Sequence, residues 1–333
     1  MNTQATEIPA PFNPPGWLAN PHLQSLLASA TLRKVLVDSS ALRAASTSSL
    51  IECGDGVRLL ASHARQPDAG PGTPLVVLIH GWEGSAESSY LLAAAAALHR
   101  EGAEVVRLNL RDHGDTHHLN EEIFHSCRLD EAVGAVAAIA RAHPGRPLYL
   151  AGWSLGGNFT VRIADRAPAA GFELTHAVAV SPVVDPANSY LAMERGLFIY
   201  RWYFLRKWRR SLARKQAAHP HLFDFSEVMR MTDLREMTAH LVDKFGEFRT
   251  VDDYFAGYAL NRGMLEGATQ PLTVITAADD PIIPAADFAG LRSGGHFHLE
   301  VHPHGGHCGF MTGVGPHSWV DARLCDIIIR GRC

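Results

Sequence analysis

The chain has 333 residues, of which 47% are hydrophobic and 19% charged, a composition typical of a globular protein with a sizeable core. Its formal net charge of -4 gives no overall attraction to nucleic acid or to an anionic membrane, which argues against polyanion binding. The five cysteines are scattered without any CxxC spacing and indicate neither a disulfide framework nor a zinc ribbon. A cytoplasmic location is expected, because no signal-peptide pattern and no apolar run of about 18 residues is present.

Short β-rich runs alternate with longer helical patterns from residue 46 onward, and this alternation predicts an α/β fold with a mostly parallel central sheet. Ahead of it, residues 1–45 are expected to form an N-terminal arm, rich in proline over its first 15 residues, and a helix. In chain order, the next expected elements are two strands joined by a turn at residues 54–56, strand 74–81, helix 88–102, strand 103–110, helix 125–142, strand 147–152, helix 155–167 and strand 176–184.

The alternation stops after this strand, since residues 186–268 contain helical patterns rich in aromatic and basic residues and no convincing strand. The sheet resumes with a strand at residue 271, and a helix is expected to start at Pro284. Another strand begins at residue 297, and residues 318–331 form the last expected helix. We therefore predict an α/β core made of residues 46–185 and 269–333, into which residues 186–268 are inserted as a helical lid.

The sequence GWSLG, residues 152–156, lies between a predicted strand and a predicted helix, the setting in which a GxSxG motif carries chemistry. Gly152 and Gly156 remove Cβ atoms where strand and helix cross, so that Ser154 can occupy a tight turn with an exposed hydroxyl. The start of the helix directs free N–H groups and the positive end of its dipole to the same place, which favours negative charge there. Without further residues, a plain tight turn explains the motif equally well.

A serine hydroxyl is a weak nucleophile until a base takes its proton, so a histidine oriented by a carboxylate is expected elsewhere in the chain. Asp280 follows the strand that begins at residue 271 and is the candidate orienting acid, with Asp279 as an alternative. His307 follows the next strand and is the candidate base, with His302 and His304 as alternatives. The serine, the acid and the histidine occur in hydrolase order, each after its own strand, and predict a catalytic triad.

Acyl transfer also needs N–H donors that bind the developing oxyanion. The sequence HGWEGS, residues 80–85, follows the buried strand at 74–81, and Gly81 lets the chain turn close to a substrate. We expect the backbone N–H groups of Trp82 and Leu155 to form this oxyanion hole.

The sequences HGWEGS, GWSLGGN, DDPIIP and GGHCGF resemble the α/β-hydrolase superfamily. NPHLQSLLAS, NLRDHGDTHH and GEFRTVDDYFAGYAL further resemble a branch of predicted bacterial esterases related to eukaryotic α/β-hydrolase-domain phospholipases, and the resemblance spans residues 11–330. It implies an α/β-hydrolase fold and a serine hydrolase of carboxylic esters, with Ser154, Asp280 and His307 in the positions of the family's triad. Such an enzyme needs no cofactor and no metal, and its substrate is a small-molecule or lipid ester.

Two segments admit other interpretations. RDHGDTHH, residues 111–118, gathers aspartates and histidines that suggest a metal site, but their spacing matches no fixed ligand pattern, and we interpret it as a polar loop over the mouth of the site. Residues 197–215 combine basic and aromatic side chains. They form either a lid helix that packs its aromatic residues on the core, which we favour, or an interfacial helix that contacts anionic lipid. Cys308, next to His307, is interpreted as a packing residue.

The expected function is hydrolysis of a carboxylic ester through an acyl-enzyme on Ser154, without a nucleic-acid partner, and with membrane contact through the lid as an open question. A serine nucleophile argues against dehalogenase and epoxide hydrolase chemistry, which in this fold usually needs a carboxylate at that position. Acyl transfer to an alcohol or thiol, or action on lipid esters as a phospholipase, uses the same triad and stays open. A ligand-binding protein on a hydrolase scaffold is the non-enzymatic alternative, and the complete set of triad residues argues against it.

Overall fold

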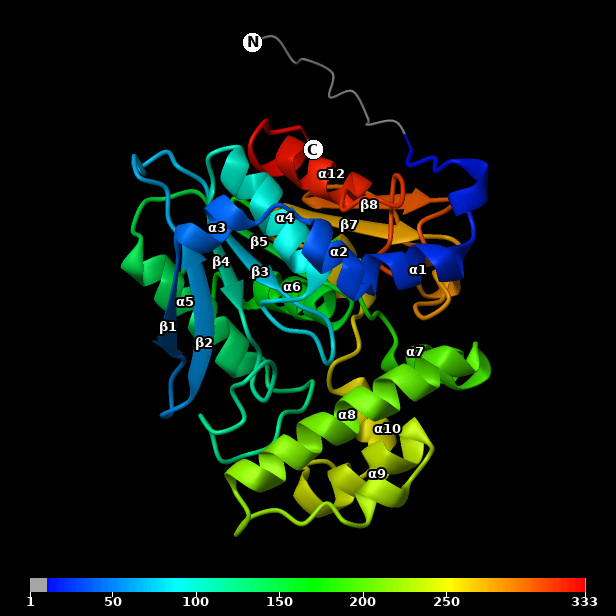
Figure 1. Ribbon diagram of the computed structural model, residues 1–333. Helices are drawn as coiled ribbons and strands as arrows, with labels where there is room; N and C mark the ends of the chain where they lie inside the picture. Colours follow the sequence, from blue (N-terminus) through cyan, green and yellow to red (C-terminus); the bar gives the residue numbers. More distant parts are fainter. Residues whose placement is uncertain (1–10, 333) are drawn as a thin grey trace.

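The computed structural model describes residues 11–332 and contains a single mostly parallel sheet within them. The strands are β1 (Ser46–Glu52), β2 (Arg58–Ala64), β3 (Leu75–Ile79), β4 (Glu104–Leu108), β5 (Leu148–Trp153), β6 (His176–Val180), β7 (Leu272–Ala277) and β8 (Phe297–His302). They lie in the order β1-β2-β4-β3-β5-β6-β7-β8 (Figure 1). β2 is antiparallel to both of its neighbours, and every other adjacent pair is parallel. The predicted α/β architecture is therefore confirmed.

The helices of residues 11–332 differ widely in length, and none of them has the length together with the apolar character that a membrane crossing requires. They are η1 (Gly16–Leu18), α1 (Pro21–Ser29), α2 (Thr31–Leu36), α3 (Ser40–Ala44), α4 (Ser89–Arg100), α5 (Leu129–Ala142), α6 (Leu155–Arg166), α7 (Pro186–Arg195), α8 (Phe198–Ala218), η2 (Val228–Arg230), α9 (Leu234–Phe245), α10 (Val251–Ala256), α11 (Arg262–Glu266), η3 (Ala285–Phe288) and α12 (Trp319–Ile328).

Helices cover both faces of the sheet, and β3 shows why its sequence is a continuous apolar run. Side chains alternate between the two faces of a strand, so a strand covered on both sides needs apolar residues throughout. Leu75, Val77 and Ile79 are buried in the cluster that contains residues of α5 and α6. Val76 and Leu78 are buried in the cluster that contains residues of α4 and α12. The central strands are thereby fixed in place, and the loops that follow them have a rigid base.

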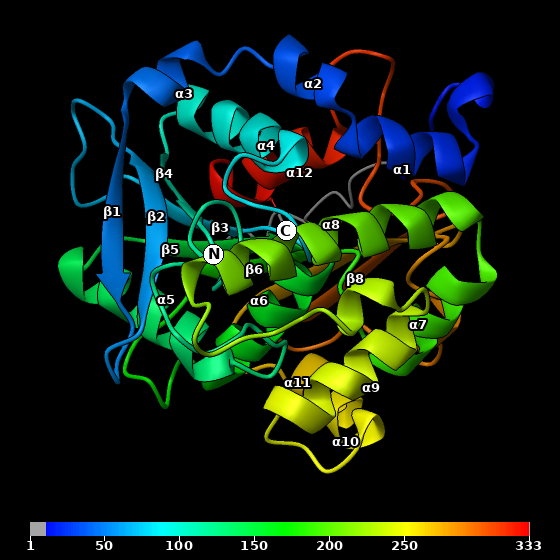
Figure 2. The same cartoon turned by 60° about the horizontal axis from the view of Figure 1, so that its bottom comes forward.

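Residues 186–268 contain α7–α11 and no strand, as the sequence predicts, and they connect β6 to β7. Figures 1 and 2 show α8, α9 and α10 gathered outside the layers of the sheet, with the long helix α8 nearest to the rest of the molecule. The sheet therefore supplies a stable frame, and these helices lie beside the loops that follow its parallel strands.

We expected an arm and a helix in residues 1–45, and this prediction is wrong for residues 16–44. Three helices and a 3-10 turn occupy this stretch, and α1, α2 and α3 lie along α4 (Figures 1 and 2). The expected arm lies partly outside the described residues, but Phe12 is buried and its N–H donates to Nδ1 of His302 (2.8 Å). This segment packs because its apolar residues find partners far along the chain, which no local pattern predicts.

Two predicted helices are shorter than the sequence indicates. The helix expected after Asp280 is only the 3-10 turn η3, because Ala289 is extended and Gly290 has a φ of +80°. The helix expected from residue 125 begins at Leu129, because the preceding residues bond elsewhere, as when the N–H of Ser126 donates to the hydroxyl of Tyr254 (3.1 Å).

Candidate active site

Ser154 lies between β5 and α6 with a φ of 55° and a ψ of -120°, a conformation that residues other than glycine seldom adopt. Its N–H donates to the carbonyl of Val180 at the end of β6 (2.9 Å). A Cβ on Gly156 would overlap main-chain oxygens at the end of β3, and one on Gly152 would overlap the backbone of Gly156. The close crossing of strand and helix therefore holds the serine hydroxyl in a fixed position.

Side chains from separate strand ends form one hydrogen-bonded chain. Oγ of Ser154 is 3.0 Å from Nε2 of His307, and Nδ1 of His307 is 3.0 Å from Oδ2 of Asp280. The other carboxylate oxygen of Asp280 accepts the N–H groups of Ile282 (2.8 Å) and Ile283 (2.9 Å). The Asp280 side chain is completely buried, while 12% of the His307 side chain is exposed. The carboxylate is thus locked by the backbone, and it orients the imidazole toward the serine.

The alternative acid and histidines from the sequence analysis have other contacts. Asp279 accepts the N–H of Gly306 (2.9 Å) and lies 3.3 Å from Nδ1 of His304, so it shapes the loop that carries His307. His302 is buried at the end of β8, where it accepts a hydrogen bond from the N-terminal segment. The structure therefore brings Asp280 and His307 to the serine, and the other three side chains support the surroundings.

The charge environment of His307 favours its protonated form. Burial lowers the pKa of the ring, but the negative charge of Asp280, the neighbouring Cys308 and the hydrogen bond to Asp280 outweigh burial and raise the pKa well above its ordinary value. Cys308 is buried in a core cluster, as the sequence suggests, and its Sγ also lies 3.7 Å from Nε2 of His307. A histidine that takes the proton of a serine hydroxyl becomes an imidazolium, and these contacts stabilise that charged form.

Helix α1 supports the loop that carries His307, a role that the sequence analysis missed. The hydroxyl of Ser25 accepts the N–H of His307 (2.8 Å). The side chain of Gln24 accepts the N–H of Met311 (2.6 Å) and donates to its carbonyl (3.2 Å). Both polar side chains are buried. The only available signal was their occurrence between apolar residues in NPHLQSLLAS, where a buried polar side chain implies a bonding partner.

The loop HGWEGS is held against Ser154 by contacts from two helices. The N–H of Gly81 donates to the hydroxyl of Tyr90 in α4 (2.9 Å), and Nζ of Lys207 in α8 donates to the carbonyl of Glu83 (3.0 Å). A Cβ on Gly81 would lie 3.1 Å from Cβ of Ser154, which leaves little room for any larger residue there. The loop therefore follows the serine closely.

Trp82 and Leu155 flank Ser154 from this loop and from the start of α6. Within residues 11–332, the N–H groups of both residues lack an acceptor, so both are free to bind a ligand oxygen. The ring of Trp82 stacks on Phe204 of α8, with centroids 5.1 Å apart and an interplanar angle of 11°, and meets Trp208 edge-on at 5.1 Å. The helix α8 thus packs directly on the residue that follows Gly81.

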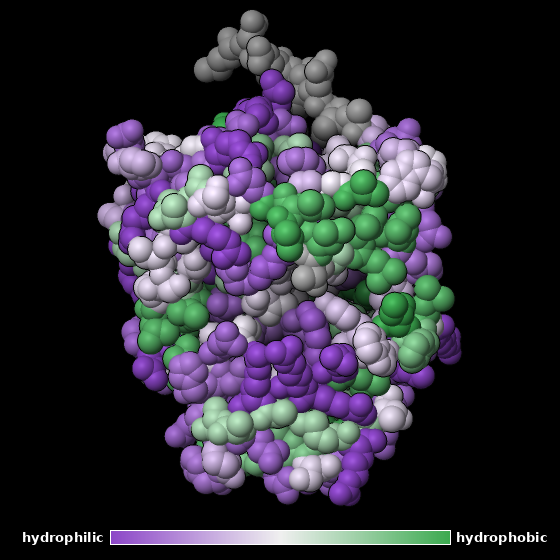
Figure 3. Space-filling view, in the orientation of Figure 1, coloured by the Kyte–Doolittle hydropathy of each residue, from purple (hydrophilic) through white to green (hydrophobic). Residues whose placement is uncertain are grey.

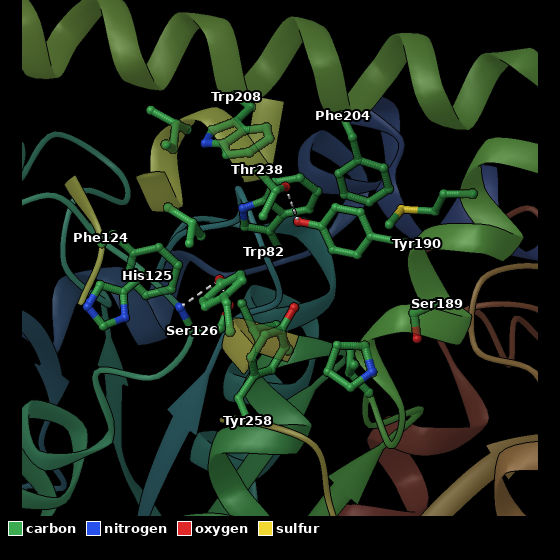
Figure 4. Close-up of a pocket in the computed structure, with 18 of the residues that line it drawn as sticks. Trp82, Phe124, His125, Ser126, Ser189, Tyr190, Phe204, Trp208, Thr238 and Tyr258 are labelled. Carbon is green, nitrogen blue, oxygen red and sulfur yellow. Dashed lines mark hydrogen bonds between the residues drawn. The ribbon is translucent and has the colours of Figure 1, made fainter. Parts of the chain in front are cut away.

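An apolar pocket opens from Ser154 beneath α8. Figure 4 shows Phe204 and Trp208 projecting from this helix toward the other lining side chains. Burial and the nearby cations, Arg128 first among them, lower the pKa of His125 to about 3, so this ring adds no charge to the pocket near neutral pH. Other residues that line the pocket include Leu155, Val183, Tyr190, Met193, Leu241, Val242, Phe245, Phe248, Tyr258, Ile282 and Ile283.

A second cavity, a groove, also reaches Ser154 and is lined mostly by polar residues. It runs between the junction of α1 and α2, at Ala30 and Lys34, and a face of α8 that carries Lys207 and Arg210. Figure 3 shows apolar side chains over α1 and α2 and a band of hydrophilic side chains over α8 below them. The two cavities share Ser154, Trp82 and Phe204, so the serine stands where they meet.

The loop RDHGDTHH joins α8 to the core through a buried ion pair. Nζ of Lys215 donates to Oδ1 of Asp112 (2.9 Å), and the side chains are only 1% and 5% exposed. The lysine also donates to backbone carbonyls at residues 120 (2.7 Å) and 122 (2.9 Å). His113 and His117 of the same loop line the groove, where burial lowers the pKa of each to about 4. The loop borders the site, and its main partner is α8.

Helix α8 presents different residues on its different faces. Phe204 and Trp208 pack on the ring of Trp82. Phe198 and Trp202 are 69% and 48% exposed, so these two aromatic residues do not pack on the core as expected. Tyr200, between them, is buried, and its hydroxyl lies 2.8 Å from Nδ1 of His22 in α1, so one face of the first turns packs and another is exposed.

Comparison with known proteins places these features in context. The model of the alpha/beta hydrolase family matches residues 76–315. Over 328 residues, covering 95% of this chain and 92% of the other, the sequence is 26% identical to a protein of Escherichia coli (strain K12) named "Putative esterase YheT". It is 25% identical over 254 residues to phospholipase ABHD3 of Mus musculus, where 73% of this chain matches 60% of that protein's length.

Solved structures share the fold at lower sequence similarity. The esterase Pf2001 of Pyrococcus furiosus aligns with a TM-score of 0.55 and 14% identity, over 86% of this chain and 92% of the other. At this level of identity the likeness extends to the fold alone.

Proposed function

Because the chain belongs to the alpha/beta hydrolase family, we propose that it is a serine hydrolase of carboxylic esters, with Ser154 as nucleophile, His307 as base and Asp280 as the orienting carboxylate. The observation that carries the proposal is the chain of 3.0 Å contacts from Ser154 through His307 to Asp280. The esterase and phospholipase names of the relatives support the same reaction class.

In the proposed reaction, Nε2 of His307 accepts the proton of Ser154 while Oγ attacks the ester carbonyl. The oxyanion that forms accepts hydrogen bonds from the N–H groups of Trp82 and Leu155. His307 then returns the proton to the leaving alcohol, and the acyl group stays on the serine. A water molecule activated by the same imidazole releases the acid. Loss of one oxyanion donor typically costs about 100- to 1,000-fold in rate, so the backbone of Leu155 matters more than its side chain.

The apolar pocket beneath α8 is the proposed site of the acyl chain, and residues 186–268 act as its lid. Aromatic and aliphatic side chains line it, which favours an alkyl or aryl acyl group over a polar one. Each methylene buried there contributes about 0.8 kcal/mol, so kcat/KM should rise by roughly fourfold per added methylene until the pocket is full. A series of p-nitrophenyl esters from acetyl to long-chain acyl measures this rise, and a uniform kcat/KM across the series would contradict the assignment of the pocket.

The proposal is tested by labelling with a fluorophosphonate probe and by hydrolysis of a short aryl ester. The wild-type protein should be labelled at Ser154, and Ser154→Ala should lose both labelling and hydrolysis by roughly 10⁴- to 10⁶-fold. Ser226→Ala, in an exposed loop after α8, serves as the matched control and should keep both. Full esterase activity in Ser154→Ala, or a wild-type protein that is neither labelled nor active, would overturn the proposal.

We also propose that the lid contacts a membrane, through exposed apolar residues of α8 together with those of α2. Phe198 and Trp202 on α8 and Leu32 and Val35 on α2 are 48–77% exposed, and both helices border the groove that leads to Ser154. Exposed apolar residues on both sides of an entrance favour peripheral binding to lipid. Co-sedimentation with phosphatidylglycerol vesicles should fall about tenfold for the double variant Phe198→Ser, Trp202→Ser. Equal co-sedimentation of the double variant and wild type would contradict this contact.

A further inference from the structure

The two halves of an ester leave its carbonyl carbon in different directions, and two cavities of different character meet at Ser154. The pocket beneath α8 is apolar, whereas the groove carries charged side chains. If the acyl chain occupies the pocket, as the proposed function states, the alcohol half must lie in the groove. The side chains of the groove would therefore contact the alcohol half and select which alcohol the substrate contains.

One helix supplies both surfaces. Phe204 and Trp208, one turn apart on α8, face the apolar pocket. Tyr203, Lys207, Arg210 and Arg214 recur at helical spacing on the neighbouring face of α8 and line the groove. The basic residues of this helix are therefore not spread evenly over a solvated surface. Three of them line the passage to the serine.

The acidic side chains in the groove leave this positive charge largely unbalanced. Glu87 is paired with Arg43 (2.6 Å) and Arg107 (2.8 Å), and Asp112 is paired with Lys215. Burial raises the pKa of Glu83 to about 8 despite the nearby Lys207, so this carboxyl is mostly neutral at pH 7.

Two of the groove cations form ion pairs with acidic side chains. Lys34 lies 3.7 Å from Glu87, and Arg214 pairs with Asp115 (3.1 Å). Within the described part of the chain, Lys207 forms no ion pair; it donates to the carbonyl of Glu83 and lies over the ring of Tyr203. The guanidinium of Arg210 has neither an ion pair nor a hydrogen bond among residues 11–332, so two cations are available to a ligand.

We propose that the groove binds the alcohol half of the ester, and that Lys207 and Arg210 select an alcohol that carries an anionic group such as a phosphate. The inference rests on the proposed function and names the substrate class of the same site. The reaction is ordinary hydrolysis: Oγ of Ser154 bonds to the acyl carbon, the bond from that carbon to the alkoxy oxygen breaks, and His307 gives its proton to the departing alcohol. Water then converts the acyl-enzyme to the carboxylic acid.

The test compares two soluble esters with one acyl chain, 1-octanoylglycerol 3-phosphate and 1-octanoylglycerol, each below its micellar concentration. Wild type should prefer the phosphate ester, and added salt should weaken this preference. Arg210→Gln should lower kcat/KM for the phosphate ester by about 10- to 100-fold, the range expected for a lost hydrogen bond to a charged group, and leave the neutral ester within about twofold. Arg210→Glu should lower it further. Neither change removes a contact from the folded chain, so misfolding is not expected.

Arg206→Gln is the matched control. Arg206 lies on the same helix but over the ring of Trp202, 5.6 Å from its centroid, and does not line the groove. Its kcat/KM for both esters should equal that of wild type. Equal losses on both esters in Arg210→Gln, or no preference for the phosphate ester in wild type, would overturn the inference while labelling of Ser154 upheld the proposed function. Absence of both labelling and hydrolysis would instead overturn the proposed function.

A second arm identifies the source of the anionic group. Vesicles of dioctanoyl phosphatidylglycerol in an inert lipid are compared with vesicles of dioctanoyl phosphatidylcholine in the same lipid. Preference in both arms supports an anionic head group of a lipid, and preference in the soluble arm alone supports a free phosphorylated ester. Either result upholds selection by charge, and a lack of preference in the soluble arm rejects it whatever the vesicle arm shows.

Discussion

The loops at the strand ends and the helix α8 above them are held by different forces. Asp280 is fixed by backbone N–H groups, Ser154 by the carbonyl at the end of β6, and the loop of His307 by Ser25. Helix α8 stacks aromatic rings over Trp82, and its polar side chains, Lys215 among them, bond to loops rather than to strands. Loops held directly by the ends of a buried sheet resist displacement, whereas a helix held through other loops can shift with them, so we expect the catalytic residues to be rigid and α8 to be adaptable.

The largest effect that separates the two regions is expected for Asp280→Asn. Without the carboxylate, Nδ1 of His307 loses its orienting acceptor and the imidazole adopts the wrong tautomer, and comparable changes cost about 10⁴-fold in kcat. Asp279→Asn, one residue away, is the control: it touches the loop and not the ring of His307, and should cost about tenfold or less. Steady-state kinetics on a short aryl ester decide. A larger loss of kcat in Asp279→Asn than in Asp280→Asn would identify Asp279 as the orienting acid.

The next largest effect concerns α8 and should appear in the free energy of unfolding. Lys215→Met leaves Asp112 buried without its cation, and breaking a buried pair in this way costs about 3–5 kcal/mol. The double variant Lys215→Met, Asp112→Asn removes both charges and should recover most of the loss. Thermal unfolding and limited proteolysis of residues 186–268 measure the stability of the single and double variants. Unchanged unfolding of the single variant would mean that α8 is held mainly by its aromatic contacts.

Features set by neighbouring residues could be predicted from the sequence, whereas contacts between distant residues could not. The motif around Ser154, the order of the triad residues and the strands that carry them follow local rules, because a glycine-bounded turn and an alternating pattern are visible in neighbouring residues. Ser25 could not be assigned, since its partner His307 is 282 positions away. Lys215 lies in a run of basic residues that indicates exposure, yet only 1% of its side chain is exposed. Burial of such groups is decided by tertiary contacts, which leave no local signal.

A smaller effect tests whether the N-terminal helix belongs to the rigid region. Ser25→Ala removes the acceptor of the His307 N–H, and an unsatisfied buried donor costs about 1–3 kcal/mol. If the loop shifts as a result, kcat should fall by about tenfold while KM for a short ester changes little. Ser25→Thr keeps the hydroxyl and should restore most of kcat. Equal kcat in the alanine variant and wild type would assign α1 to packing alone.

The smallest effect concerns the pH dependence set by Cys308. His307 accepts a proton only when neutral, and its pKa is raised, so kcat/KM should be high at alkaline pH and fall as pH drops through a value above 6.5. Cys308→Ala removes one of the contacts that raise this pKa and should move the fall toward lower pH, with little change in the alkaline plateau. Profiles of kcat/KM from about pH 5 to 9 measure the shift. Cys325→Ala, a buried cysteine in α12, is the control and should leave the profile in place. A profile of Cys308→Ala that coincides with wild type would show that the thiol packs against the ring without affecting its charge, and the rigid region would then owe its basicity to Asp280 alone.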